Sequence, residues 1–172
     1  MFTKPQDVVV ALKLALGGAS LSYADLGQEL GMSASEVHAA VRRLVDARLF
    51  DPDSKRVRVE ALRNFLVHGV PYAFPASLKQ LTRGIPTAWA APAFAGKISS
   101  GDQIPPVWPD PAGQVLGSSV KPLYASVPAA SRRNPALYDL LALVDAMRIG
   151  RARERAFAEK EIGERLNRHA AA

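Results

Sequence analysis

Basic side chains occur in two short groups whose spacing suits contacts with a polyanion. Arg42 and Arg43 are adjacent, and Lys55-Arg56-Val57-Arg58 alternates cations with an apolar residue. Arginine forms paired hydrogen bonds with phosphate and with the edge of guanine, whereas lysine binds phosphate as a compact point charge. Both groups therefore predict contacts with nucleic acid rather than a catalytic role.

No constellation of residues predicts catalysis. His38, His68 and His169 stand far apart, and the chain has no cysteine, which excludes thiol chemistry and cysteine-ligated zinc. Gly96-Lys97 lacks both the upstream glycine and the following hydroxyl of a phosphate-binding loop. We therefore expect a protein that is not an enzyme and that needs no metal and no cofactor.

The elements that position the first basic group read as helix, turn, helix. Ser22 is a cap for a short helix, Gly31 supplies the left-handed residue that ends it, and Ser33 with Glu36 forms a capping box for the next helix. In the second helix the apolar positions Val37, Val41, Leu44 and Val45 recur at helical spacing and face the core. The opposite face then carries Ser35, His38, Ala39, Arg42 and Arg43.

A two-stranded hairpin is expected next. Arg48-Leu49-Phe50 begins an extended run, Asp51-Pro52-Asp53-Ser54 turns, and residues 55–59 alternate cation and valine at period two. This order of elements, with Leu26, Leu30, Gly31-Met32-Ser33 and Leu49 at their spacing, resembles the winged helix-turn-helix regulators of the MarR type. The resemblance implies a DNA-binding domain over residues 1–70. The predicted DNA contacts are Ser33, Ser35, His38, Arg42, Arg43, Lys55, Arg56 and Arg58.

Flanking helices complete this N-terminal part. Thr3 and Gln6 suggest a capping box for a first helix that ends at Gly17-Gly18 and is apolar on more than one side. Its second apolar side is open to two interpretations, packing on another subunit or on a C-terminal segment of the same chain. Glu60 to His68 predicts a short helix that Gly69 ends.

Residues 71–133 form a proline-rich segment. Eleven of the thirteen prolines fall between Pro71 and Pro135, which argues against long helices and predicts an irregular subdomain. We expect a hairpin pairing residues 105–108 with 115–116 across Asp110-Pro111-Ala112-Gly113. The stretch 82–92 resembles part of the AbiEi-type antitoxins and regulators, which implies repression and contact with a nucleotidyltransferase-type toxin. In that stretch Arg83 is a candidate partner contact.

Residues 134–172 predict two helices for dimer or partner contact. Asn134 caps and Pro135 opens a helix whose Leu137, Leu140, Leu141, Val144 and Met147 form an apolar stripe. Gly150 stops or bends it, and Arg151 to Leu166 continues as a charged helix. Arg148, Arg151 and Arg155 are predicted to share one face, as candidate partner contacts.

The chain as a whole is expected to be mainly α with a small β-wing, followed by the proline-rich irregular segment and C-terminal helices. Its net charge of +6 favours an acidic partner, and no stretch is apolar enough for a membrane span. We predict a cytoplasmic, homodimeric regulator, acting as a repressor, that binds double-stranded DNA. The alternative is an antitoxin or assembly subunit that binds a protein partner through its C-terminal half.

Overall fold

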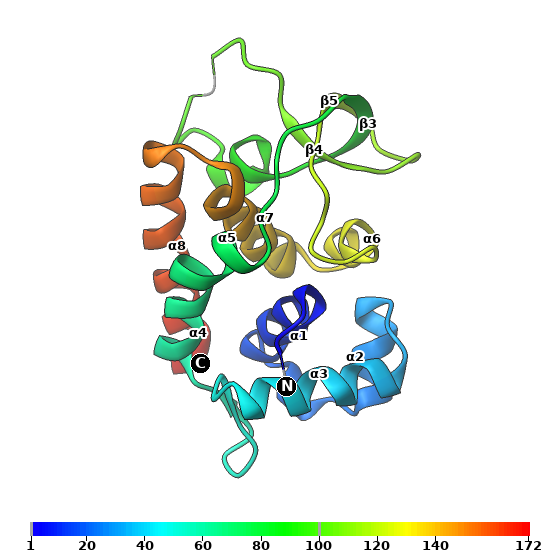
Figure 1. Cartoon of the computed structure of the whole chain (residues 1–172), viewed down its shortest axis with the longest axis vertical. Helices are drawn as coiled ribbons and strands as arrows, with labels where there is room; N and C mark the ends of the chain where they lie inside the picture. The colour runs from blue at the N-terminus through cyan, green and yellow to red at the C-terminus, as the bar shows by residue number, and fades with distance from the viewer. Residues whose placement is uncertain (1, 100) are drawn as a thin grey trace.

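Three helices and a hairpin form the N-terminal part of the computed structural model, which describes residues 2–99 and 101–172 (Figure 1). The box predicted for Thr3 and Gln6 is wrong. Pro5 opens the first helix, and the Lys4 amide donates to the Asp7 carboxylate at 2.8 Å, because proline is favoured at the first helical position. In order, the elements are α1 Pro5–Ala15, η1 Gly18–Ser20, α2 Tyr23–Leu30, α3 Ala34–Asp46, β1 Phe50–Asp51 and β2 Arg56–Val57.

The helix after the hairpin does not stop at Gly69, contrary to the prediction. The chain runs through α4 Val59–Asn64 and a π-helical turn, η2 Phe65–Gly69, into α5 Val70–Ala73. Gly69 is not in the left-handed conformation, with φ of −107°. A Cβ atom at this position would lie 2.6 Å from the Phe65 ring, so the glycine allows close packing instead of ending the helix.

The proline-rich segment forms a small closed barrel. Its strands are β3 Leu81–Pro86, β4 Pro106–Pro109 and β5 Val115–Ser119. The short helices η3 Ala88–Ala90 and η4 Pro92–Phe94 lie between β3 and β4. Strand β3 is antiparallel to both others, whereas β4 and β5 run parallel, so the predicted hairpin between them is wrong. A Cβ atom at Gly84 would lie 1.9 Å from the Trp108 carbonyl oxygen, and one at Gly113 would meet the Gly84 backbone. Close backbone approach at these two glycines permits the closure.

The C-terminal part contains α6 Val127–Arg133, α7 Pro135–Ile149 and α8 Ala152–Ala171. The predicted cap is confirmed, since the Asn134 side chain accepts from the Leu137 amide at 3.1 Å. Gly150 ends α7. The charged helix predicted from Arg151 to Leu166 corresponds to α8, which packs on the body through the buried Ala158, Ile162 and Leu166. The chain is thus mainly α with a small β component.

Helix α1 lies at the centre of the core, between α3 on one side and α7 on the other, with α8 packed beside it (Figure 1). Val8, Val9 and Val10 point in different directions, yet each is at most 1% exposed. The second apolar side of α1 is therefore covered by the C-terminal helices of the same chain. It is not available to a second subunit, and one continuous apolar cluster runs through all three predicted segments.

Candidate nucleic-acid interface

Helix α3 begins where its sequence signals place it. The Ser33 hydroxyl accepts from the Glu36 amide at 3.1 Å, and the Glu36 carboxylate accepts from the Ser33 amide at 2.7 Å, which confirms the capping box. The predicted apolar positions Val37, Val41 and Leu44 are buried. Consequently the outer face of α3 is polar and solvent-exposed; its exposed residues include Ser33, Ser35, His38 and Arg42.

Arg43 does not belong to this face, contrary to the prediction. It is 7% exposed, and its guanidinium donates two hydrogen bonds of 2.8 Å to the buried Asp7 carboxylate of α1. These bonds raise the pKa of Arg43, although burial opposes the shift. Arg43 stands three positions after the buried Ala40, at the edge of the core side. The sequence does contain a signal for this buried ion pair. Asp7 is a lone carboxylate directly before an apolar run, and a carboxylate that is buried requires a partner.

The β1–β2 hairpin presents the second basic group. Phe50 pairs with Val57 and Asp51 with Arg56, and the inward Phe50 and Val57 hold the hairpin on the body. In the turn, Asp51 accepts from the Ser54 hydroxyl at 2.8 Å and from the Asp53 amide at 3.1 Å, which lowers the pKa of its carboxyl. The strands are shorter than predicted because Val59 already starts α4. The predicted cations Lys55, Arg56 and Arg58 are exposed, as are Pro52, Asp53 and Ser54 in the turn.

Figure 1 shows the hairpin projecting from the body at the C-terminal end of α3. Helix α3 and the hairpin that carries the second basic group are therefore neighbours along the chain and in space. Such an arrangement suits a duplex, because an α-helix fits the major groove while flanking cations hold the phosphates beside it.

Tyr23 is an additional exposed residue that the sequence analysis missed. Its ring lies 5.3 Å from that of His38, between centroids, and 41% of Tyr23 is exposed. Tyr23 and Lys55 also line a hollow of about 430 Å³ between α2, α3 and the hairpin. The sequence gives only a weak signal for Tyr23. It is an aromatic residue directly after the Ser22 cap, and it lies off the apolar stripe of a short helix.

The turn between α2 and α3 is held by two residues that directly precede α6. The Ser126 hydroxyl donates to the Leu30 carbonyl oxygen at 2.5 Å, and the Tyr124 hydroxyl donates to Glu36 at 2.8 Å. Gly31 is left-handed as predicted, with φ of 67°, and a Cβ atom there would lie 2.8 Å from Ser126 Cβ. Hydrogen bonds from the Ser33 amide and the Tyr124 hydroxyl lower the pKa of the Glu36 carboxyl. The C-terminal half thus fixes the start of α3.

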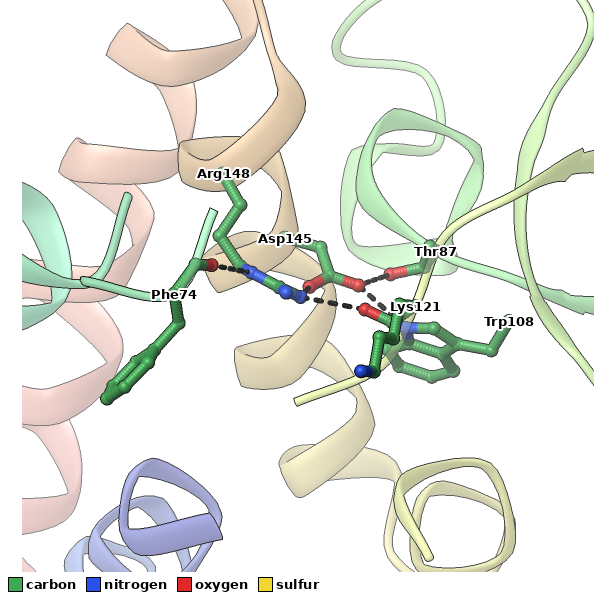
Figure 2. A network of polar contacts seen from close by, with 6 residues as sticks. All are labelled: Phe74, Thr87, Trp108, Lys121, Asp145 and Arg148. Carbon is green, nitrogen blue, oxygen red and sulfur yellow. Dashed lines mark hydrogen bonds and ion pairs between the residues drawn. The ribbon is translucent and has the colours of Figure 1, made fainter. Parts of the chain in front are cut away.

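Arg148 is not available to a partner, contrary to the prediction. Its side chain is 4% exposed and donates to Asp145 at 2.7 Å, to the Phe74 carbonyl at 2.8 Å and to the Lys121 carbonyl at 3.2 Å (Figure 2). Asp145 also accepts from Thr87 at 2.7 Å and from the Trp108 indole at 2.6 Å. Burial raises the pKa of the Asp145 carboxyl, and the Arg148 charge and these hydrogen bonds oppose the shift.

The other predicted partner contacts remain accessible. Arg151 is the N-cap residue of α8 and Arg155 lies in its first turns, so the break at Gly150 separates both from Arg148 and the three do not share one helical face. Arg151 and Arg83 are exposed, and Arg155 is half-buried. Elsewhere in α8, the Arg165 guanidinium donates a hydrogen bond of 3.0 Å to the Glu161 carboxylate.

Comparisons of the chain with protein-family models, with curated proteins and with solved structures found no match. The likeness to MarR-type and AbiEi-type regulators therefore stays a prediction. Among residues 2–99 and 101–172, no helix is long and apolar enough to cross a bilayer. Within the same residues, no group of three or more acidic or histidine side chains is placed to hold a metal ion.

Proposed function

We propose that the chain is a sequence-specific regulator that binds double-stranded DNA and acts as a repressor. One observation carries the proposal: the capped helix α3 exposes Ser35, His38 and Arg42 on one face, and a projecting basic hairpin stands at its end. In such an arrangement α3 would lie in the major groove, and the hairpin would contact the DNA backbone beside it. The winged helix-turn-helix class is part of the same proposal.

Within this proposal the residues divide by role. Arg42 reads guanine with paired hydrogen bonds, and Ser35 and His38, near the start of α3, reach neighbouring base edges. The exposed end of α3 at Ser33 binds a phosphate, while Lys55, Arg56 and Arg58 hold the backbone beside the site. Arg43 has no role in DNA contact, because its guanidinium is committed to Asp7.

Homodimer formation is a second part of the proposal, because two copies related by a two-fold axis double the length of sequence that is read. The apolar stripes that made α1 and α7 candidates for the dimer interface are buried in their own chain, so we do not assign the interface to them. A dimer bound across a promoter would block access to it, which is the basis of the proposed repression.

The proposal is tested by selecting sites from a library of randomised duplexes and titrating the selected duplex at several salt concentrations. We expect one enriched motif, and an affinity that falls steadily as salt rises from about 50 to about 200 mM because phosphate contacts release counterions. If no duplex is bound more tightly than a random one at low salt, the proposed function is wrong.

A further inference from the structure

Exposed apolar side chains gather in the barrel and in the segments around it. Soluble proteins seldom expose several large apolar side chains together unless they contact a partner. Tyr72 is 77% exposed, Leu78 45%, Leu81 54%, Ile104 53% and Leu116 65%. The barrel and the start of α8 lie at the end of the molecule opposite the β1–β2 hairpin (Figure 1).

Two hollows connect part of this set into one groove. The first, of about 340 Å³, is lined by Tyr72, Leu78 and Ile149; the second, of about 290 Å³, is lined by Leu78, Ile149, Trp89 and Ile104. Leu78 and Ile149 belong to both, so the hollows adjoin. We name this feature the apolar groove and define it by these five residues. It lies where α7 ends at Gly150 and α8 begins.

The exposed face of the barrel extends the groove. Arg83 pairs with Leu116 and Leu81 with Ser118 in the register of β3 and β5, so these four side chains share one face of the sheet. Ser118 also lines the second hollow. The groove and the barrel face therefore form one continuous surface.

The charged rim of this surface is mainly positive. Arg155 lines the first hollow and Arg151 the second, where Glu154 is also present. Neither arginine takes part in an ion pair within residues 2–99 and 101–172, whereas Arg148 is occupied by Asp145. An occupant with apolar anchors and carboxylates would match both the apolar lining and the two arginines.

We propose that the apolar groove docks an acidic segment of another protein, with large apolar side chains seated on Leu78 and Ile149 and carboxylates facing Arg151 and Arg155. A second copy of the chain fits less well, since the chain carries a net charge of +6 and a second copy would bring further positive charge toward these arginines. Duplex DNA fits less well too, because the phosphates and sugars that it presents gain little from the apolar floor. The inference is independent of DNA binding, and the two surfaces lie at opposite ends of the molecule.

The test is a selection of peptides of about 15 residues from a randomised display library on the full chain, without DNA. Selected peptides are expected to be negatively charged and to carry at least two large apolar residues. Leu78→Asp and Arg151→Glu should each weaken their binding about tenfold or more, the size of a hot-spot loss. Arg168→Glu makes the same charge change near the other end of α8 and should leave binding unchanged.

Circular dichroism of each variant separates lost binding from lost folding, and the exposed positions of Leu78 and Arg151 favour folded variants. The proposal is overturned if the selection yields no binders, or if the selected peptides are basic. It is also overturned if both groove variants bind as well as the wild type. Light scattering that shows the groove variants alone to be monomeric would instead assign the groove to a second copy.

Discussion

Arg42 and Arg43 are neighbours in α3, and a rotation of about 100° per residue places them in different environments. Arg42 is exposed, whereas Arg43 is enclosed between α3 and α1 with its guanidinium on Asp7. A buried ion pair contributes little net stability when intact, yet removing one member leaves an uncompensated charge in the core. Arg43 is therefore a structural residue, and Arg42 is free for recognition.

Arg43→Ala should lower the free energy of unfolding by about 3–5 kcal/mol, because it strands the Asp7 carboxylate. Urea denaturation measures the change, and Arg42→Ala, on the exposed face, should stay within about 0.5 kcal/mol of the wild type. The double variant Asp7→Leu with Arg43→Met should recover most of the loss. Equal effects of Arg42→Ala and Arg43→Ala would contradict the assignment.

Glu36 predicts a pH dependence. Its carboxylate accepts from the Ser33 amide and the Tyr124 hydroxyl, which lowers its folded-state pKa below the ordinary value of 4.5. This stabilisation is present above the unfolded-state pKa and is lost as pH falls through the lowered value. The free energy of unfolding of Glu36→Gln should therefore be lower than that of the wild type at pH 7. The difference between the two should become smaller below about pH 4.5. A gap that is constant from pH 7 to pH 3 would show that the charge of Glu36 has no part in it.

At the scale of elements, α1 is the member on which both halves of the chain pack. Helices α3 and α7 cover opposite sides of it, and α8 closes a third. Its apolar residues thus have a core role within one chain.

Leu12→Ala should lower the free energy of unfolding by about 2–5 kcal/mol, since Leu12 is fully buried and its truncation leaves a cavity. The loss should not depend on protein concentration, and the oligomeric state should be unchanged. Leu116→Ala is the matched control on an exposed site and should have little effect on stability. If the loss in the free energy of unfolding of Leu12→Ala depends on protein concentration, α1 takes part in a subunit interface and the assignment is wrong.

Several local signals predicted their elements correctly, whereas the box at Thr3 and Gln6 and the stop at Gly69 did not. Ser22, Gly31, Ser33 with Glu36, and Asn134 act through bonds within a few residues, and each behaves as expected. Interactions between distant residues were not predictable. The closure of the barrel depends on backbone contacts at Gly84 and Gly113, and the burial of Arg43 depends on a carboxylate 36 residues away. Nothing in the local spacing of those residues specifies such partners.

At the scale of the whole molecule, α7 connects the two proposed surfaces. The buried network of Asp145 ties the barrel to α7 through Thr87 and Trp108, and α7 packs in turn on α1 (Figure 2). The proposed DNA surface lies at one end of the molecule and the apolar groove at the other. Variants at one end should therefore leave binding at the other end nearly unchanged.

The central claim, that α3 reads bases while the hairpin holds the backbone, is tested most directly by comparing Arg42→Ala and Arg56→Ala on one selected duplex and its single-base variants over a range of salt. Arg42→Ala should flatten the preference between duplexes, with a loss of about 1–3 kcal/mol of discrimination at one position. Arg56→Ala should weaken all duplexes alike and reduce the salt slope by about one contact. Arg151→Ala, in the apolar groove, should leave DNA affinity nearly unchanged. A silent Arg42→Ala, with the loss of DNA binding concentrated at Arg151 and Arg155, would contradict the account.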